Sequence, residues 1–198
     1  MERIRSKIAI LTVFLAAVGS LHAGEPLPIR NCTWCHGTGA QGFTTAPRLA
    51  GQRQQYIMNQ LRDFNRHTRD NPLSRQYMWP AAENLNPQVA RDLALYFSAL
   101  PPRAANDGDS GLAERGKEIY ELGIADSNVA ACVVCHGPKA EGVRQIPRLA
   151  GLTDAYLRKR LEQWSQGFHA TAELMPQIAS TLSADEIESL ASYLSFIK

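Results

Sequence analysis

Apolar side chains recur at helical spacing in two stretches of the chain, one near its middle and one at its end. In the first stretch they are Val89, Leu93, Tyr96, Phe97 and Leu100. In the second they are Ile187, Leu190, Tyr193, Leu194 and Ile197. Spacings of three and four residues place such side chains on one face of an α-helix. Ser183 precedes the second stretch and Glu186 follows three residues later, a pattern typical of a capping box at a helix start.

Helical patterns also cover residues 112–123, LAERGKEIYELG, and the segments that follow the two copies of PRLAG. No window of useful length alternates with the period of two that a half-buried strand requires. With 44% hydrophobic and 20% charged residues, the composition is that of an ordinary globular protein. We therefore predict an all-α fold.

The first 23 residues have the character of a secretory signal peptide. Arg3, Arg5 and Lys7 precede an apolar run of 12 residues, 8–19, and Ala23 offers a cleavage site. The run is shorter than the ~20 residues that a transmembrane helix needs, although an uncleaved anchor remains the alternative. We predict export to the periplasm of a mature chain, residues 24–198, without a transmembrane span. Peripheral membrane association stays open.

Two halves of the chain repeat each other. CTWCH at residues 32–36 returns as CVVCH at 132–136, and PRLAG follows each copy at the same distance. The offset is 100 residues at the cysteines and 97 at Met78 and Met175, so the first half carries three extra residues between Gly51 and Met78, most simply within residues 65–77. Each half ends in its own amphipathic stretch, and residues 101–111, rich in Pro, Gly, Asp and Ser, join them. We predict two domains, residues 24–104 and 105–198.

All four cysteines lie in the two CxxCH motifs, which limits the roles that they can have. A disulfide framework would scatter its cysteines, a shared zinc site would need the pairs closer in sequence, and a thioredoxin-like pair needs a βαβ context. None of these readings explains the histidine. In C-x-x-C-H the two thiols bind the vinyl groups of a haem and the histidine becomes an axial iron ligand. The motifs therefore predict two covalently bound haem c groups, held by Cys32, Cys35, His36, Cys132, Cys135 and His136.

The ligand at the sixth coordination position of the haem iron distinguishes an electron carrier from a catalyst. Met175 is the one methionine of the second half, and the repeat matches it to Met78. A thioether sulfur suits low-spin haem iron and raises its potential. We predict these two methionines as distal ligands. The alternatives are Met58, which sits among apolar positions of a helix, and bis-histidine ligation through His67 or His169.

The combination of CxxCH, a proline 11 residues beyond the histidine, a later methionine and a closing helix, given twice, resembles the cytochrome c4 family of dihaem class I cytochromes c. The resemblance implies two tandem class I cytochrome c domains, each wrapped around one haem, that pass single electrons. It also implies that the carbonyls of Pro47 and Pro147 accept hydrogen bonds from the proximal imidazoles. Arg48 and Arg148 are expected to pair with haem propionates.

The first half departs from this pattern because only GEPLPIRN separates the predicted cleavage site from Cys32. That segment is too short and too rich in proline for a leading helix of the kind predicted over 112–123. We expect a more exposed first haem, or a partner that covers it.

The predicted function and partners follow from the assignment of a methionine to the sixth coordination position of each haem iron. We predict an electron-transfer protein, not an enzyme, that links a dehydrogenase or quinol-oxidising complex to a terminal oxidase or other acceptor. The alternatives are a dedicated subunit of one dehydrogenase, such as a thiosulfate or sulfide dehydrogenase, and a dihaem enzyme such as a peroxidase. Partners are redox proteins of unknown identity, and the basic residues are too sparse for nucleic-acid binding.

Charge is unevenly distributed between the halves of the mature chain. Residues 24–106 hold nine basic and five acidic side chains, and residues 107–198 hold nine and thirteen. Such a dipole can orient the protein toward its partners. If the helix that follows the first PRLAG continues far enough, Arg62, Arg66 and Arg69 share one face as a docking patch.

Overall fold

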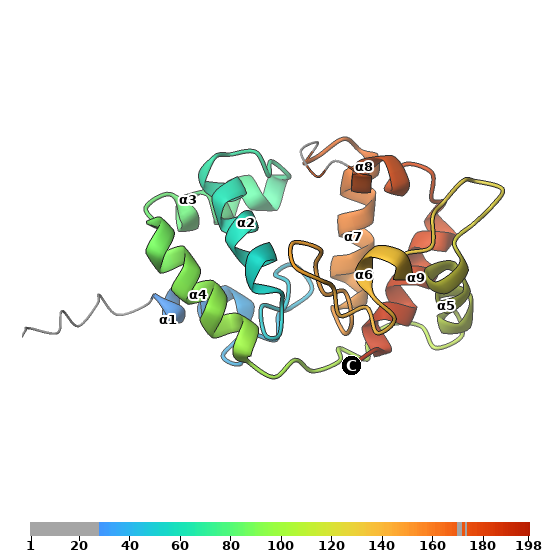
Figure 1. Cartoon of the computed structure of the whole chain (residues 1–198), viewed down its shortest axis with the longest axis horizontal. Helices are drawn as coiled ribbons and strands as arrows, with labels where there is room; N and C mark the ends of the chain where they lie inside the picture. The colour runs from blue at the N-terminus through green and yellow to red at the C-terminus, as the bar shows by residue number, and fades with distance from the viewer. Residues whose placement is uncertain (1–27, 170–171, 173) are drawn as a thin grey trace, which may run out of the picture.

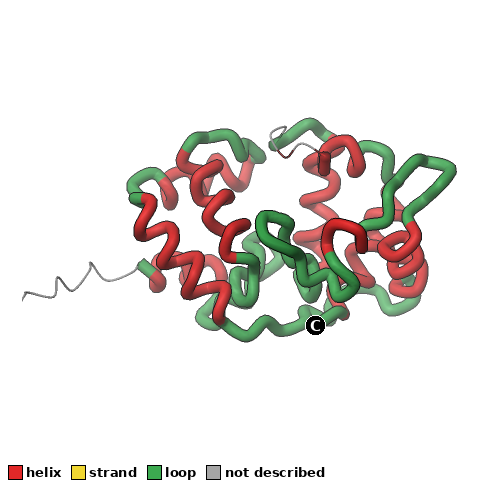
Figure 2. The backbone as a smooth tube through the Cα atoms, viewed as in Figure 1, coloured by secondary structure: helices red, strands yellow, loops and turns green. Residues whose placement is uncertain are grey.

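The computed structural model describes residues 28–169, 172 and 174–198, so the predicted signal peptide, residues 1–23, lies outside the described part of the chain. The described residues form two helical lobes, joined at one end by an extended segment (Figure 1). Loop segments from both lobes run between the two sets of helices (Figure 2). None of the helices in this part of the chain has the length and hydropathy that a bilayer crossing requires.

The first lobe contains four α-helices and one π-helical turn. They are α1 (Ile29–His36), α2 (Gln54–Asn65), the π turn η1 (Ser74–Met78), α3 (Trp79–Ala82) and α4 (Pro87–Ala99). Asn86 caps α4 by accepting a hydrogen bond from the Val89 amide at 2.9 Å. Pro87 follows at the first helical position, where its missing N–H costs nothing.

The second lobe contains five α-helices. They are α5 (Ala113–Leu122), α6 (Val133–His136), α7 (Asp154–Ser165), α8 (Leu174–Ala179) and α9 (Ala184–Phe196). The capping box predicted at Ser183 and Glu186 is present at the start of α9. Within the described ranges, extended pairing is limited to two isolated bridges, one at Ile124 and Val129 and one at Val143 and Ile146. The prediction of an all-α fold is confirmed.

Each lobe has its own apolar core, and the two cores use matching positions of the repeat. The first core contains Ala40, Ala50, Ile57, Leu93, Ala94 and Phe97. The second contains the equivalents Ala140, Ala150, Leu157, Leu190, Ala191 and Leu194, together with Leu152, Ile119 and Tyr120. Ile119 and Tyr120 belong to α5 and are fully buried. The second core therefore includes side chains from a leading helix that has no counterpart in the first core over the described residues, which begin at Pro28.

The segment before Cys32 forms no separate leading helix in the described residues, as expected, although its last three residues are helical. Residues Ile29 to Asn31 are helical, because they form the first turn of α1, the helix that carries the first CxxCH motif. A separate helix equivalent to α5 does not precede α1 in the described residues. In the second lobe, α6 is only four residues long and α5 is a distinct element that packs along α9.

The predicted arginine patch on the first lobe is wrong. Helix α2 ends at Asn65, and the chain then turns through His67, whose φ is +60°. Arg62 and Arg66 are exposed, whereas Arg69 is only 6% exposed and donates a hydrogen bond to Tyr156 of the second lobe. The three side chains do not share one helical face.

Candidate haem sites

The two CxxCH motifs adopt the same local structure. Cys32 and Cys35 lie three residues apart on α1, one helical turn, and Cys132 and Cys135 are placed in the same way at α6. None of the four cysteines forms a disulfide, and the second cysteine of each motif is exposed. Burial raises the pKa of Cys32, and it raises the pKa of Cys132 to about 11, so these thiols are protonated at neutral pH. Two thiols one helical turn apart, followed directly by a histidine, have the spacing that covalent attachment of a haem uses.

A tight loop follows each motif and fixes the histidine. The Gly42 amide donates a hydrogen bond to the His36 carbonyl at 2.9 Å, and the Gly142 amide donates to the His136 carbonyl at 2.8 Å. Both glycines have positive φ, and a Cβ at Gly42 would lie 2.5 Å from the backbone nitrogen of Arg48. Only glycine allows this approach of the loop to the PRLAG segment.

The proximal imidazoles are buried and oriented. His36 and His136 are each 6% exposed. Their Nδ1 atoms lie 2.7 Å from the Pro47 carbonyl oxygen and 3.0 Å from that of Pro147. Because a carbonyl only accepts hydrogen bonds, Nδ1 carries the proton and Nε2 keeps a free lone pair. Burial lowers the pKa of both histidines, so each imidazole is neutral and each Nε2 is available as an iron ligand.

The methionines occupy different local structures. Met78 is half-buried at the end of η1, and Met175 is half-buried at the second position of α8. A π turn contains one extra residue relative to an α-helical turn and is frequent at functional sites. Met58 packs against the core of the first lobe, which accords with its interpretation as core filler.

Both histidines considered as alternative ligands contact other side chains of the protein. His67 stacks on Trp79, with ring centroids 4.0 Å apart, on the exposed surface. His169 is 5% exposed, and its Nδ1 lies 2.5 Å from Nη2 of Arg160. His169 Nε2 faces Asp63 Oδ2 at 3.9 Å. Both rings therefore have partners in the protein.

Arg48 crosses from the first lobe to the second. It is 4% exposed and donates hydrogen bonds to the carbonyls of Arg103, Ala150 and Gly151. Burial, followed by the charge of Arg148, lowers the pKa of Arg48 to about 10. The contacts of the Arg48 side chain in the described residues therefore join the two lobes.

A second contact between the lobes pairs an amide side chain with a peptide group. Gln52 Nε2 donates to the Arg148 carbonyl at 2.9 Å, and Gln52 Oε1 accepts from the Arg148 amide at 2.7 Å. Gln52 is 7% exposed. Since both bonds form between the same two residues, they fix the relative positions of the two PRLAG segments.

A cluster of buried cations between the lobes was missed by the sequence reasoning. Arg69 donates to Tyr156 Oη at 3.2 Å across the interface, and its guanidinium lies 4.9 Å from the Phe64 ring centroid. Arg160 lies 4.1 Å from the Trp164 ring centroid. Within the described residues neither guanidinium forms a salt bridge with a carboxylate. Phe64 and Trp164 occupy matching positions of the repeat, and this symmetry was the one available signal.

Several buried polar atoms in this region have no hydrogen-bond partner among the residues that the structure describes. They are Arg69 Nε, Arg148 Nε, Asn71 Nδ2 and Trp164 Nε1. All four are donors, and buried donors without an acceptor are costly. Acceptors that carry negative charge would satisfy the donors and also balance the buried arginines. The donor set thus fits a group with carboxylates, as haem has.

Comparisons with known proteins agree with this arrangement. The cytochrome c family model matches residues 113–198. A cytochrome c4 of Thiocapsa roseopersicina is 32% identical over 89% of this chain and 92% of its own length. A thiosulfate dehydrogenase electron acceptor of Thiomonas intermedia is 31% identical over 98% of this chain and 90% of its own length. The structure of cytochrome c4 from Acidithiobacillus ferrooxidans superimposes with a TM-score of 0.79, at 33% identity, over 84% of this chain and 98% of that one.

Both lobes therefore hold their proximal histidine in the same way, and the relatives match nearly the full length of the chain. The chain belongs to the cytochrome c4 family and is a dihaem electron-transfer cytochrome with two covalently bound haem c groups.

Proposed function

We propose that this protein is an exported carrier of single electrons whose two haems have the same ligands. The first cytochrome c domain, residues 24–104, attaches its haem through Cys32 and Cys35, and the second, residues 105–198, attaches its haem through the matching cysteines. The axial pairs are His36 with Met78 and His136 with Met175. Residues 1–23 serve as the signal peptide, and the mature protein acts in the periplasm.

The observation that carries this proposal is the duplicated proximal hydrogen bond. In each lobe the imidazole Nδ1 is held by a proline carbonyl, at 2.7 Å and 3.0 Å, so that Nε2 is fixed in direction. A rigid ligand with filled partners needs little rearrangement when the iron changes oxidation state. Matching methionines in the two halves favour the same ligation for both haems.

This arrangement favours a carrier over an enzyme. The bound haem supplies an iron that alternates between the ferric and ferrous states. A peroxidase needs an open or displaceable sixth position on at least one iron, whereas we assign a methionine of this chain to each. The protein's contribution is to hold the imidazoles, to exclude water and to present the haem edges to partners.

The proposed route of electrons is from a dehydrogenase or quinol-oxidising complex to a terminal oxidase or other acceptor. A second candidate is a dedicated acceptor for thiosulfate dehydrogenase. It is favoured by the 31% identity, over 98% of this chain, to the Thiomonas intermedia protein named for that role. Reduction of the purified protein by thiosulfate dehydrogenase and by no other donor tested would favour this candidate.

The experiment is a potentiometric titration of the purified, haem-loaded protein and of Met78→Ala, Met175→Ala and Met58→Leu. We expect the wild type and Met58→Leu to show the full absorption band from methionine sulfur to ferric iron, two one-electron steps and no carbon monoxide binding. Each alanine variant should lose about half of the band and bind carbon monoxide at one haem. If Met58→Leu loses the band, or if the wild type binds carbon monoxide, the ligand assignment is wrong.

A further inference from the structure

Helix α4 of the first lobe exposes a face that its counterpart in the second lobe buries. The 97-residue offset of the closing helices matches α4 to α9. On α9, Ser189 and Ser192 are 3% and 1% exposed. The residue of α4 that matches Ser192 is Leu95, which is 58% exposed, and its neighbour Tyr96 is 39% exposed. The same helix position is thus covered in one lobe and open to solvent, with a larger apolar side chain, in the other.

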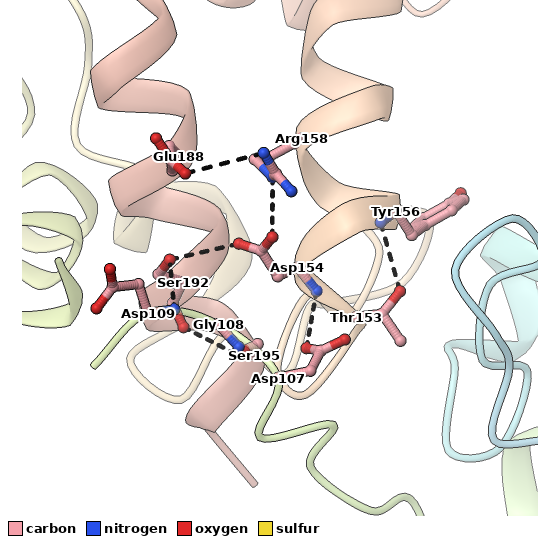
Figure 3. A network of polar contacts seen from close by, with 10 residues as sticks. All are labelled: Asp107, Gly108, Asp109, Thr153, Asp154, Tyr156, Arg158, Glu188, Ser192 and Ser195. Carbon is pink, nitrogen blue, oxygen red and sulfur yellow. Dashed lines mark hydrogen bonds and ion pairs between the residues drawn. The ribbon is translucent and has the colours of Figure 1, made fainter. Parts of the chain in front are cut away.

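Two segments cover this face of α9. Helix α5 crosses it so closely that a Cβ at Gly116 would lie 1.9 Å from the Ser189 carbonyl oxygen. The loop before α5 adds hydrogen bonds from the Gly108 amide to Ser195 Oγ, at 3.0 Å, and from the Asp109 amide to Ser192 Oγ, at 3.1 Å (Figure 3). The cover of α9 is therefore a helix together with the segment that leads into it.

The mature first lobe has no equivalent segment of sufficient length. Cleavage after Ala23 leaves four residues, 24–27, before the described chain begins at Pro28. Four residues span about 14 Å when fully extended, and they cannot form the ten-residue helix that α5 supplies. If α4 is covered, a segment of another molecule covers it.

The charge of the first lobe indicates what kind of molecule covers α4. Six arginines of the first lobe are exposed: Arg30, Arg62, Arg66, Arg75, Arg91 and Arg103. Glu83 is the exposed acidic residue in the described part of this lobe, and the half-buried Asp63 and Asp70 lie within 3.5 Å of Arg62 and Arg75. Asp92, one turn before Leu95 and Tyr96 on α4, is half-buried and accepts a hydrogen bond from Gln88 at 2.9 Å. Arg91 lies one turn before Leu95 on α4, so the positive charge extends to the open face. A second copy that docked through its first lobe would bring the same positive charge, which like-charge repulsion disfavours. Its second lobe is acidic, but the apolar side chains Ile119 and Tyr120 of the acidic helix α5 are already buried in that lobe's own core, so a helix of a different protein matches the α4 face better.

We propose that the α4 face, defined by Arg91, Leu95 and Tyr96, is the docking site for an acidic amphipathic helix of a different protein, a redox partner. The partner helix packs an apolar stripe on Leu95 and Tyr96, with small residues where the helices cross, as Gly116 does on α9. Its carboxylates face Arg91 and the neighbouring arginines. The proposal rests on the proposed function in two respects, the removal of residues 1–23 and the partner's being a redox protein.

The test uses the haem-loaded protein with a photoreactive p-benzoylphenylalanine at position 95, and a control with it at position 122. Leu122 is a matched control because it is a helical leucine, 79% exposed, on the acidic second lobe. After illumination in a periplasmic extract, mass spectrometry identifies the crosslinked peptides. Binding of the captured protein, once purified, is then measured for the wild type, Leu95→Ser and Leu122→Ser.

We expect position 95 to crosslink to a helix of net negative charge in a redox protein. Leu95→Ser should weaken binding by at least about fivefold while Leu122→Ser leaves it unchanged. Four results would overturn the proposal. Position 95 could crosslink to a second copy of this chain, to residues 1–27 of the same chain, or to nothing at all, or both positions could crosslink equally. Failure of the docking proposal can be told apart from failure of the proposed function by absorption spectra. If the wild type lacks the band from methionine sulfur to ferric iron, the proposed ligation is refuted, and the crosslinking result still stands.

Discussion

Replacement of Gly116 by alanine tests how closely α5 and α9 pack. In the structure, a Cβ at this position would lie 1.9 Å from the Ser189 carbonyl oxygen and 2.7 Å from Tyr193 Cβ. The first neighbour is backbone, so the conflict cannot be relieved by a side-chain rotation. The two helices would have to separate, and overpacking of this kind costs about 3 kcal/mol at the upper end of its usual range. Alanine recovers about 1 kcal/mol through its higher helix propensity.

We therefore expect Gly116→Ala to lower the free energy of unfolding by about 2 kcal/mol, which is roughly 4–8 °C in Tm for a chain of this size. The assay is thermal and urea unfolding of the haem-loaded protein. Gly39→Ala is the control, because its nearest neighbour, Gln41 Cγ, lies 3.6 Å away in ordinary contact. A Gly116→Ala protein as stable as the wild type would refute the close crossing of α5 and α9.

Two further predictions concern the contacts between the lobes. Gln52→Leu should lower the free energy of unfolding by about 1–3 kcal/mol, because it leaves the Arg148 amide and carbonyl without partners. The measurement is a urea titration, and Gln55→Leu, on the exposed side of α2, is the control that should change the stability little. Burial lowers the pKa of His169 from its ordinary value of 6.5, so the unfolded state takes up the proton first as the pH falls. Wild-type stability should therefore decrease below pH 6.5, and this part of the decrease should vanish in His169→Gln; a pH profile identical in the two proteins would contradict the interpretation.

The helices were predictable because their signals are local. The apolar periods that end at Leu100 and Ile197 match α4 and α9, and the capping box at Ser183 needs only residues within one turn. The haem motif is equally local, since its two thiols and its imidazole lie within five residues. Such signals do not depend on how the rest of the chain folds.

The features that the sequence did not reveal depend on contacts between the lobes. Arg69 follows α2, and a charged residue at such a position is expected at the surface. It is buried because Tyr156 of the other lobe lies against it. Arg48 was expected at a haem propionate, and in the structure its guanidinium contacts carbonyls of the second lobe, Ala150 and Gly151. Pattern analysis of one segment cannot find partners about 100 residues away. The π turn before Met78 was also missed, although the repeat had placed extra residues in that region.

The repeat shows which parts of the two lobes diverged. Six core positions match between the lobes, as do the proximal hydrogen bonds and the glycines that turn the chain after each histidine. The differences lie at the surface, in the leading helix and in the balance of charge. A haem site tolerates little change in the residues that hold its ligands, whereas a surface is free to change until a partner binds it. The open face of α4 and the positive charge of its lobe are therefore the features in which we expect this chain's choice of partner to reside.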